Sequence, residues 1–214
     1  MKIKPELLTL YGVTDRSWLK GEPLSKVVEQ VLLGGVTLLQ LREKELPLKD
    51  FIQEAKEIKR VTDFYGVPLI INDNIEVCLA CEAAGVHVGQ SDMEAGQVRR
   101  LLGEERIIGV TAKTVEQAVK AQECGADYLG SGAVFGSATK LDTRKMSLEM
   151  LDDICESVSI PVVAIGGIDE DNVDQLAGHK MDGIAVVSAL FGAASPQAAA
   201  RRLREKMEAM IYGH

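Results

Sequence analysis

The segment PLIINDN, residues 68–74, begins like a buried strand and ends on three polar residues in succession. Its apolar part, LII at residues 69–71, is the kind of run that a strand covered on both faces needs. Asn72, Asp73 and Asn74 then follow without a break. A turn or a helix N-cap explains one such residue. Whether a turn explains all of them depends on the rest of the chain.

The remainder of the sequence repeats this unit, because short apolar segments alternate with longer amphipathic ones. The predicted strands are residues 10–15, 37–42, 68–72, 85–89, 107–112, 128–132, 161–167 and 183–188. Helical segments lie between them, for example at 24–35, 48–66, 114–125 and 148–158. Glycines typical of helix C-caps follow such segments at Gly35, Gly66, Gly85 and Gly125.

Eight strands alternating with helices predict a parallel sheet covered by helices. At roughly 27 residues per unit, the 214 residues fit a minimal (β/α)8 barrel. An open doubly wound sheet is the alternative, but it usually has a Gly-rich turn after its first strand. Here that position reads YGVTDRSW, residues 11–18. We therefore predict an α/β chain that folds as a single-domain TIM barrel over residues 1–214.

Composition excludes several classes of protein. The chain is 46% hydrophobic and 26% charged, as in globular domains, and its formal charge of −8 lacks the basic excess of a general nucleic-acid binder. The opening MKIKPELLTLYG has no signal-peptide pattern, and the longest apolar stretch, residues 184–194, is far shorter than a membrane span of about 20 residues. We expect a cytoplasmic protein. The oligomeric state stays open, with a homo-oligomer as one alternative.

The four cysteines include one CxxC pair, Cys78 and Cys81. Such a pair suggests redox chemistry or zinc. A structural zinc site needs a second matching pair, which the sequence lacks. We interpret both thiols as small buried side chains within a helix.

In a (β/α)8 barrel the active site lies at the C-terminal ends of the strands. Most residues at these ends in the present sequence are polar or glycine. The second to the fifth strand end, in turn, in Gln40, Arg42 and Lys44; Asn72 and Asp73; Asp92; and Thr111 and Lys113. The sixth strand is followed by the loop GAVFGSATK with Lys140, the seventh by Gly166, Gly167 and Ile168, and the eighth ends at Val187 and Ser188.

Two of these residues suit a metal ion. Asp73 and Asp92 are 19 residues apart, close to one strand–helix unit, and should project from neighbouring strands. Carboxylate oxygens without a cysteine or histidine cluster suit Mg²⁺, which takes one or two carboxylates together with substrate phosphate and water. Arg42, Lys44 and Lys140 would complete an anion cage. The pattern predicts a phosphorylated or pyrophosphorylated substrate.

A second phosphate site is expected at the last two strands. Gly166 and Gly167 allow an anion to approach the main chain, and barrels commonly hold phosphate there on backbone N–H groups. Val187 and Ser188 occupy the matching place on the eighth strand.

Each feature also has a purely structural interpretation. Asp73 and Asp92 could cap helices, Arg42 and Lys44 could belong to a solvated charge run with their glutamate neighbours, and the two glycines could form a tight turn. His87, flanked by valines, is more often a histidine buried in the barrel than a metal ligand. These interpretations do not explain why the residues all fall at successive strand ends.

Seven segments also resemble a known family in order and spacing: LYGVTDR, GGVTLLQLREK, PLIINDN, GVHVGQSD, DYLGSGAVFGSATK, PVVAIGGI and IAVVSAL. Over about residues 10–203 the chain resembles the thiamine-phosphate synthases. The resemblance implies a (β/α)8 transferase that joins 4-amino-2-methyl-5-pyrimidinylmethyl diphosphate to 4-methyl-5-(2-phosphoethyl)thiazole or its carboxylated form. Pyrophosphate leaves first, and the thiazole nitrogen captures the pyrimidinylmethyl cation.

The resemblance also implies roles for individual residues. Asp73 and Asp92 would hold Mg²⁺. The pyrimidine diphosphate and its leaving group would be bound by Gln40, Arg42, Lys44, Asn72, Thr111 and Lys140. The thiazole substrate would face Ser137 and Thr139, and its phosphate would bind at Gly167, Val187 and Ser188.

Two motifs depart from the family pattern. The family loop GPxFxTxTK reads GAVFGSATK here, with Ala133 in place of proline and Ser137 in place of the first threonine. The fifth strand commonly reads GxSxH, whereas here Thr111 keeps the hydroxyl and Lys113 replaces the histidine. A thiazole tautomerase, which relies on a histidine, and a non-catalytic phosphate-binding regulatory barrel are the alternatives. The tautomerase interpretation conflicts with Lys113, which stands in place of the histidine. The regulatory-barrel interpretation conflicts with the presence of both metal carboxylates.

Overall fold

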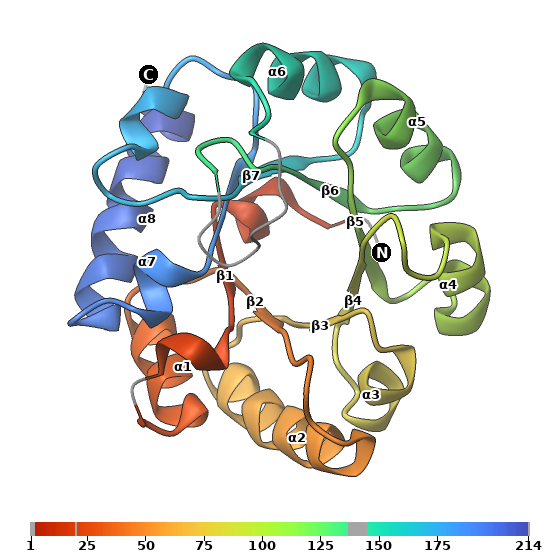
Figure 1. Ribbon diagram of the computed structural model, residues 1–214, viewed down its shortest axis with the longest axis vertical. Coiled ribbons are helices and arrows are strands. Elements are labelled where there is room, and N and C mark those ends of the chain that lie inside the picture. The colour runs from red at the N-terminus through yellow and green to blue at the C-terminus, as the bar shows by residue number, and fades with distance from the viewer. Residues whose placement is uncertain (1–2, 20, 137–144, 214) are drawn as a thin grey trace.

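Eight parallel strands close into a barrel in the computed structural model, which describes residues 3–19, 21–136 and 145–213 (Figure 1). Each strand pairs with the next in sequence, and β8 pairs with β1. The strands are β1 Leu10–Val13, β2 Leu38–Leu41, β3 Leu69–Asn72, β4 Gly85–Val88, β5 Ile107–Thr111, β6 Tyr128–Gly132, β7 Val162–Ile165 and β8 Gly183–Val186. The predicted (β/α)8 barrel is confirmed.

Helices surround the sheet (Figure 1). They are α1 Leu24–Leu33, α2 Leu48–Phe64, α3 Ile75–Ala80, α4 Ala95–Leu102, α5 Val115–Glu123, α6 Leu148–Ser157, α7 Ser188–Phe191 and α8 Pro196–Tyr212. Three 3₁₀ helices complete the described part of the chain: η1 Pro5–Leu8, η2 Arg16–Trp18 and η3 Val173–Leu176. The connection from β7 to β8 contains η3 in place of an α-helix. No helix among the described residues is long and apolar enough to cross a membrane.

The strands are mostly apolar because both of their faces are buried. Leu39, Leu69 and Val86 belong to the core between the sheet and the helices, whereas Leu38 and Ile70 belong to a smaller core inside the barrel. Successive strand residues point to opposite faces, so a strand packed on both sides needs an unbroken apolar run. Ile3 and Leu8 join the inner core and close the N-terminal end of the barrel.

Three of the four predicted helix-capping glycines do follow a helix. Gly35, Gly66 and Gly125 come after α1, α2 and α5 with φ of 104°, 67° and 88°, the left-handed conformation that glycine adopts without a Cβ clash. Gly85 does not fit the prediction, because α3 ends at Ala80 and Gly85 is the first residue of β4. A Cβ at Gly85 would lie 1.9 Å from the carbonyl oxygen of Ile107, so this glycine allows β4 and β5 to pair closely.

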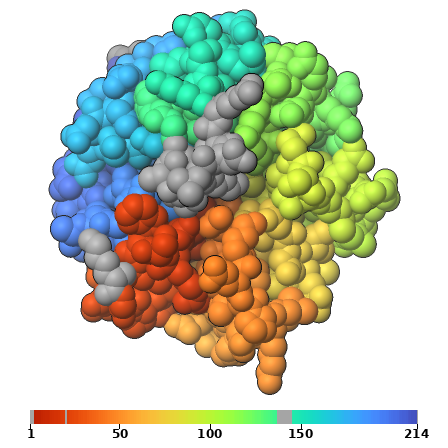
Figure 2. Space-filling model, viewed as in Figure 1, coloured from red at the N-terminus to blue at the C-terminus, as the bar shows by residue number. Residues whose placement is uncertain are grey.

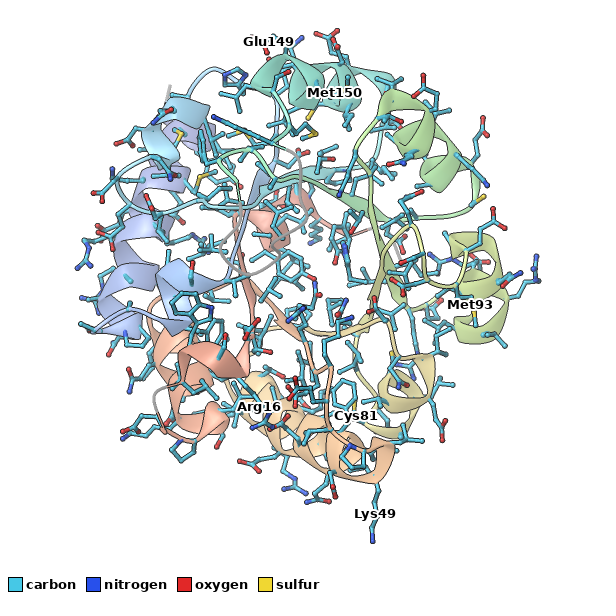
Figure 3. The ribbon with its side chains drawn as sticks, in the orientation of Figure 1. Arg16, Lys49, Cys81, Met93, Glu149 and Met150 are labelled. Atoms are coloured by element: carbon cyan, nitrogen blue, oxygen red, sulfur yellow. The ribbon has the colours of Figure 1, made fainter. Side chains whose placement is uncertain are left out.

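The interpretation of the CxxC pair as structural is supported. Cys78 and Cys81 are buried free thiols in and just after α3, and Figure 3 shows Cys81 on the side of α3 that faces α2. Burial raises the pKa of the Cys78 thiol to about 12. Since the thiolate is the metal ligand and the nucleophile, this environment disfavours both kinds of chemistry.

Gly85→Ala should destabilise the fold by at least about 2 kcal/mol, because its methyl group would overlap backbone atoms of Ile107 that cannot rotate away. Gly96→Ala in α4 is the matched control, since the nearest atoms to its new methyl group are 3.9 Å away. There alanine should stabilise by about 0.5 kcal/mol through helix propensity. Urea unfolding of both variants measures the difference, and equal stability would contradict the close pairing of β4 with β5.

Candidate active site

Asp73 stands at the C-terminal end of β3 with its carboxylate between two side chains. Lys44 Nζ donates to Asp73 Oδ2 at 2.5 Å, and Asn72 Nδ2 donates to Asp73 Oδ1 at 2.9 Å. The Asp73 backbone has φ of 60°, which is uncommon outside glycine, and its N–H donates to the carbonyl of His87 at 2.9 Å. Backbone pairing to β4 therefore fixes where this carboxylate lies.

The three polar residues that end β3 have separate functions. Asn74 is the N-cap of α3, and its side chain accepts a hydrogen bond from the Val77 N–H at 2.9 Å. Asp73 is therefore not the cap of this helix. Asn72 Nδ2 donates to Asp73 and to the His87 carbonyl, while Asn72 Oδ1 is buried without a hydrogen-bond partner in the described part of the chain. That oxygen is an unused acceptor at the strand end.

Asp92 approaches Asp73 from the loop after β4. Burial raises the pKa of the Asp73 carboxyl, the nearby Lys44 ammonium lowers it, and the Asp92 carboxylate raises it again. Asp92 Oδ2 accepts the Gly89 N–H at 2.7 Å and does not cap α4, which is preceded by Glu94. The structure thus brings the two predicted metal carboxylates together.

The carboxylates of Asp73 and Asp92 suit Mg²⁺ better than structural zinc. Among residues 3–19, 21–136 and 145–213 there is no cluster of three or more His, Cys, Asp or Glu side chains that could hold an ion. A cation at Asp73 and Asp92 would therefore depend on water or substrate oxygens for its remaining ligands. Mg²⁺ is commonly bound in this way, whereas structural zinc is not.

Arg42 and Glu43 are paired with the loop that follows β1, which contains η2. Arg42 Nη1 donates to Asp15 Oδ2 at 3.0 Å, and Arg16 Nε donates to Glu43 Oε2 at 2.6 Å. The Glu43 side chain is only 6% exposed. Arg42 and Glu43 are therefore not part of the solvated charge run considered as an alternative, whereas Lys44 and Glu45 are exposed. Figure 2 shows the two loops, in red and orange, side by side on one face of the barrel.

A line of hydrogen-bonded side chains crosses the barrel interior. Gln40 Nε2 donates to the Tyr11 hydroxyl at 2.6 Å, and that hydroxyl lies 2.8 Å from the hydroxyl of Tyr128. The Tyr128 hydroxyl lies 3.0 Å from His87 Nδ1, and His87 Nε2 lies 3.0 Å from Thr111 Oγ1. The line connects Gln40 and Thr111, two predicted substrate contacts on opposite sides of the interior.

His87 is a buried barrel histidine, as predicted, because it is 9% exposed and both ring nitrogens have hydroxyl neighbours. The tyrosines were not predicted. Burial raises the pKa of both Tyr11 and Tyr128, so their hydroxyls stay neutral near pH 7. Gly109 was a possible signal for them in the sequence, since a Cβ there would lie 2.1 Å from Tyr128 Cζ.

Packing explains the two glycines after β7, which are also predicted to bind a phosphate. Gly166 and Gly167 have φ of 103° and 68°. A Cβ at Gly166 would lie 2.4 Å from Ala133 Cβ, and one at Gly167 would lie 2.7 Å from the Gly136 carbonyl oxygen. Contact between the loops after β6 and β7 therefore requires glycine here. Val187 is the N-cap of α7, and Ser188 is its first residue.

The structure describes only some of the remaining predicted residues. Lys113 is exposed, and its backbone N–H donates to Gln117 Oε1 at 2.8 Å. Ser137, Thr139 and Lys140 lie outside the described residues. The described site thus contains Gln40, Arg42, Lys44, Asn72, Asp73, Asp92 and Thr111 around the C-terminal strand ends, with Gly167, Val187 and Ser188 at the ends of β7 and β8.

A closed parallel barrel with paired charges at its C-terminal strand ends defines the class of this protein as a (β/α)8 barrel enzyme. Comparison with known proteins gives the family. The family described as thiamine monophosphate synthase matches residues 10–190. The thiamine-phosphate synthase of Clostridium tetani is 53% identical over 184 residues, covering 86% of this chain and 88% of that protein. That of Ruminiclostridium cellulolyticum is 49% identical, covering 92% and 94%.

A solved structure agrees with these relatives. The thiamine phosphate pyrophosphorylase from Pyrococcus furiosus superposes with a TM-score of 0.89 at 38% identity, covering 97% of this chain and 98% of that one. The chain therefore belongs to the thiamine monophosphate synthase family, and it is a transferase.

Tyr128→Phe should cost about 1–3 kcal/mol of stability, because it removes the hydroxyl between Tyr11 and His87 and leaves two buried polar groups without that partner. Tyr65→Phe is the control, since that hydroxyl bonds the surface residue Glu29 and its loss should change stability by less than about 0.5 kcal/mol. Chemical denaturation of both variants gives the two values. Equal losses of stability in the two variants would show that the buried hydrogen bonds of Tyr128 contribute no more than the surface hydrogen bond of Tyr65.

Proposed function

We propose that this chain condenses 4-amino-2-methyl-5-pyrimidinylmethyl diphosphate with 4-methyl-5-(2-phosphoethyl)thiazole to give thiamine phosphate and pyrophosphate. If the carboxylated form of the thiazole is used, its carboxyl group leaves as CO₂. The observation that carries the proposal is the cluster of Lys44, Asp73 and Asp92 at the ends of β2, β3 and β4. Arg42 follows the same strand as Lys44, two residues before it. Family membership supplies the reaction class.

The reaction needs charge stabilisation more than a nucleophile. The bond between the pyrimidinyl methylene and the diphosphate oxygen breaks, and its electron pair leaves with pyrophosphate. The lone pair of the thiazole nitrogen then forms the new bond to the methylene cation. Groups that stabilise the leaving anion lower such a barrier most effectively. Arg42 and Lys44 supply positive charge for this purpose, and Lys140 is proposed to add a third cation.

Polar side chains would orient the pyrimidine diphosphate. Gln40 faces the barrel interior, where its amide is already held by Tyr11. Asn72 has a buried Oδ1 with no hydrogen-bond partner among the described residues, so this oxygen can accept a hydrogen bond from a substrate N–H. The Thr111 hydroxyl, held by His87, is proposed to donate to the pyrophosphate.

We propose Asp73 and Asp92 as the ligands of Mg²⁺, which would add positive charge beside the departing pyrophosphate. Their proximity supports this assignment, since two adjacent carboxylates without a bound cation repel each other. Lys44, bonded to Asp73, offsets part of that repulsion in this structure.

The thiazole substrate is proposed to face Ser137 and Thr139. Its phosphate would bind the backbone at Gly167, Val187 and Ser188. Gly167 has no side chain to block the approach of an anion to the main chain. The proposed partners are thus phosphorylated small molecules. We propose a cytoplasmic location for the reaction, which the free thiols of Cys78 and Cys81 would suit.

Purified protein mixed with both substrates and Mg²⁺ should form thiamine phosphate, detected after oxidation to fluorescent thiochrome. Omitting either substrate, or adding EDTA, should abolish the signal. Diphosphate binding without product would favour the regulatory barrel. Conversion of a thiazole tautomer alone, without the diphosphate, would favour the tautomerase.

Asp73→Ala should lower kcat by at least about 10²-fold, the size of effect seen when an electrostatic stabiliser is removed. Asp63→Ala is the matched control, because Asp63 is an exposed aspartate that also pairs with a lysine, Lys59. Steady-state rates across a Mg²⁺ titration test the assignment. Near-normal turnover of Asp73→Ala at limiting Mg²⁺ would disprove it.

A further inference from the structure

The loop after β1 is attached to the end of β2 by its backbone. The Thr14 N–H donates to the Gln40 carbonyl at 3.0 Å, and the Arg42 N–H donates to Thr14 Oγ1 at 2.9 Å. Thr14 is buried. The residue that follows it, Asp15, is thereby held at a set distance from the Arg42 side chain.

The carboxylate of Asp15 has two separate sets of partners. Its Oδ1 accepts hydrogen bonds from the Ser17 N–H at 3.0 Å and the Ser17 hydroxyl at 2.6 Å, and so caps η2. Its Oδ2 accepts from Arg42 Nη1 at 3.0 Å. Because Ser17 fixes one oxygen, the other faces Arg42 in a defined orientation.

The pair is shielded from water more than most ion pairs between described residues. The side chains of Arg42 and Asp15 are 21% and 12% exposed, whereas those of Lys26 and Glu22 are 58% and 51% exposed. Shielded pairs interact more strongly than exposed ones, which contribute little. Arg42 is therefore held by an interaction strong enough to select one orientation of a long, flexible side chain.

We propose that Asp15 is a positioning residue, which holds the Arg42 guanidinium in the orientation that binds the diphosphate. The inference rests on the proposed function of Arg42. A guanidinium carries five N–H donors in one plane, and the bond to Asp15 uses Nη1. The remaining donors stay available for phosphate oxygens. If Asp15 instead competed with the diphosphate for Arg42, the Asp15→Asn variant would bind pyrophosphate more tightly.

Asp15→Asn tests the proposal, because the amide keeps an acceptor for Ser17 but loses the negative charge that holds Arg42. The kcat/KM for the pyrimidine diphosphate should fall by about 10-fold or more, the range for a hydrogen bond to a charged group. The KM for the thiazole phosphate should change by less than about 2-fold, since Arg42 is assigned to the other substrate. Inorganic pyrophosphate with Mg²⁺ should bind more weakly by calorimetry.

Ser17→Ala is the matched control. It removes only the hydroxyl that bonds Asp15 Oδ1. The backbone N–H of residue 17 still donates to Oδ1, and Oδ2 stays on Arg42. Its kcat/KM should stay within about 3-fold of the unmodified chain, as expected for a change at an exposed polar contact. A loss as large as that of Asp15→Asn would assign the effect to the η2 cap and overturn the proposal.

A double-mutant cycle with Arg42→Ala separates positioning from general stability. If Asp15 acts through Arg42, adding Asp15→Asn to Arg42→Ala should lower kcat/KM by less than about 2-fold further, because residues in one interaction are not additive. Rates are compared per folded molecule, measured by circular dichroism. Full additivity, or tighter pyrophosphate binding by Asp15→Asn, would overturn the proposal.

The two possible failures are distinguishable. An unmodified chain that neither forms thiamine phosphate nor binds pyrophosphate refutes the proposed function. An active unmodified chain whose Asp15→Asn variant has the same kinetics refutes the role of Asp15 alone.

Discussion

The pairing of β3 with β4 is the constraint on which the site depends. Asn72 lies opposite His87 in this register, and the Asp73 N–H donates to the His87 carbonyl. A one-residue shift of β4 against β3 would turn His87 out of the barrel, because neighbouring strand residues point to opposite faces. The same backbone pairing thus positions a carboxylate at the rim and a histidine beneath it.

The polar groups form two connected systems. At the rim, carboxylates and cations are matched in pairs, with Asp15 on Arg42 and Asp73 on Lys44. Inside the barrel, neutral donors and acceptors join Gln40 to Thr111 through two tyrosines and His87. The charged pairs therefore lie at the rim, where their side chains stay partly exposed, and the neutral hydroxyls lie inside, where burial would penalise a charge. The proposed reaction, in which charge develops on the leaving pyrophosphate, would require such a separation.

Much of this arrangement could be predicted before the structure was known. The alternation of apolar and amphipathic segments specified the barrel, because a strand covered on both faces is apolar along most of its length. The rule that active sites occupy C-terminal strand ends then selected Gln40, Arg42, Lys44, Asn72, Asp73, Asp92 and Thr111. Gly85 was misassigned as a helix cap because a glycine before an apolar run looks the same whether it ends a helix or begins a strand that approaches its neighbour closely.

Other features depended on the tertiary structure. Asp15 and Arg42 are 27 residues apart, and Tyr11 and Tyr128 are 117 apart, so no local pattern relates them. Pairing of β1 with β2 brings Asp15 to Arg42, and closure of the sheet sends tyrosines from β1 and β6 into the same interior. The sequence by itself determined the order of strands and the polar residues at their ends, since both follow from local periodicity. The tertiary structure decided which of those residues contact each other, because partner choice depends on register and on closure of the barrel.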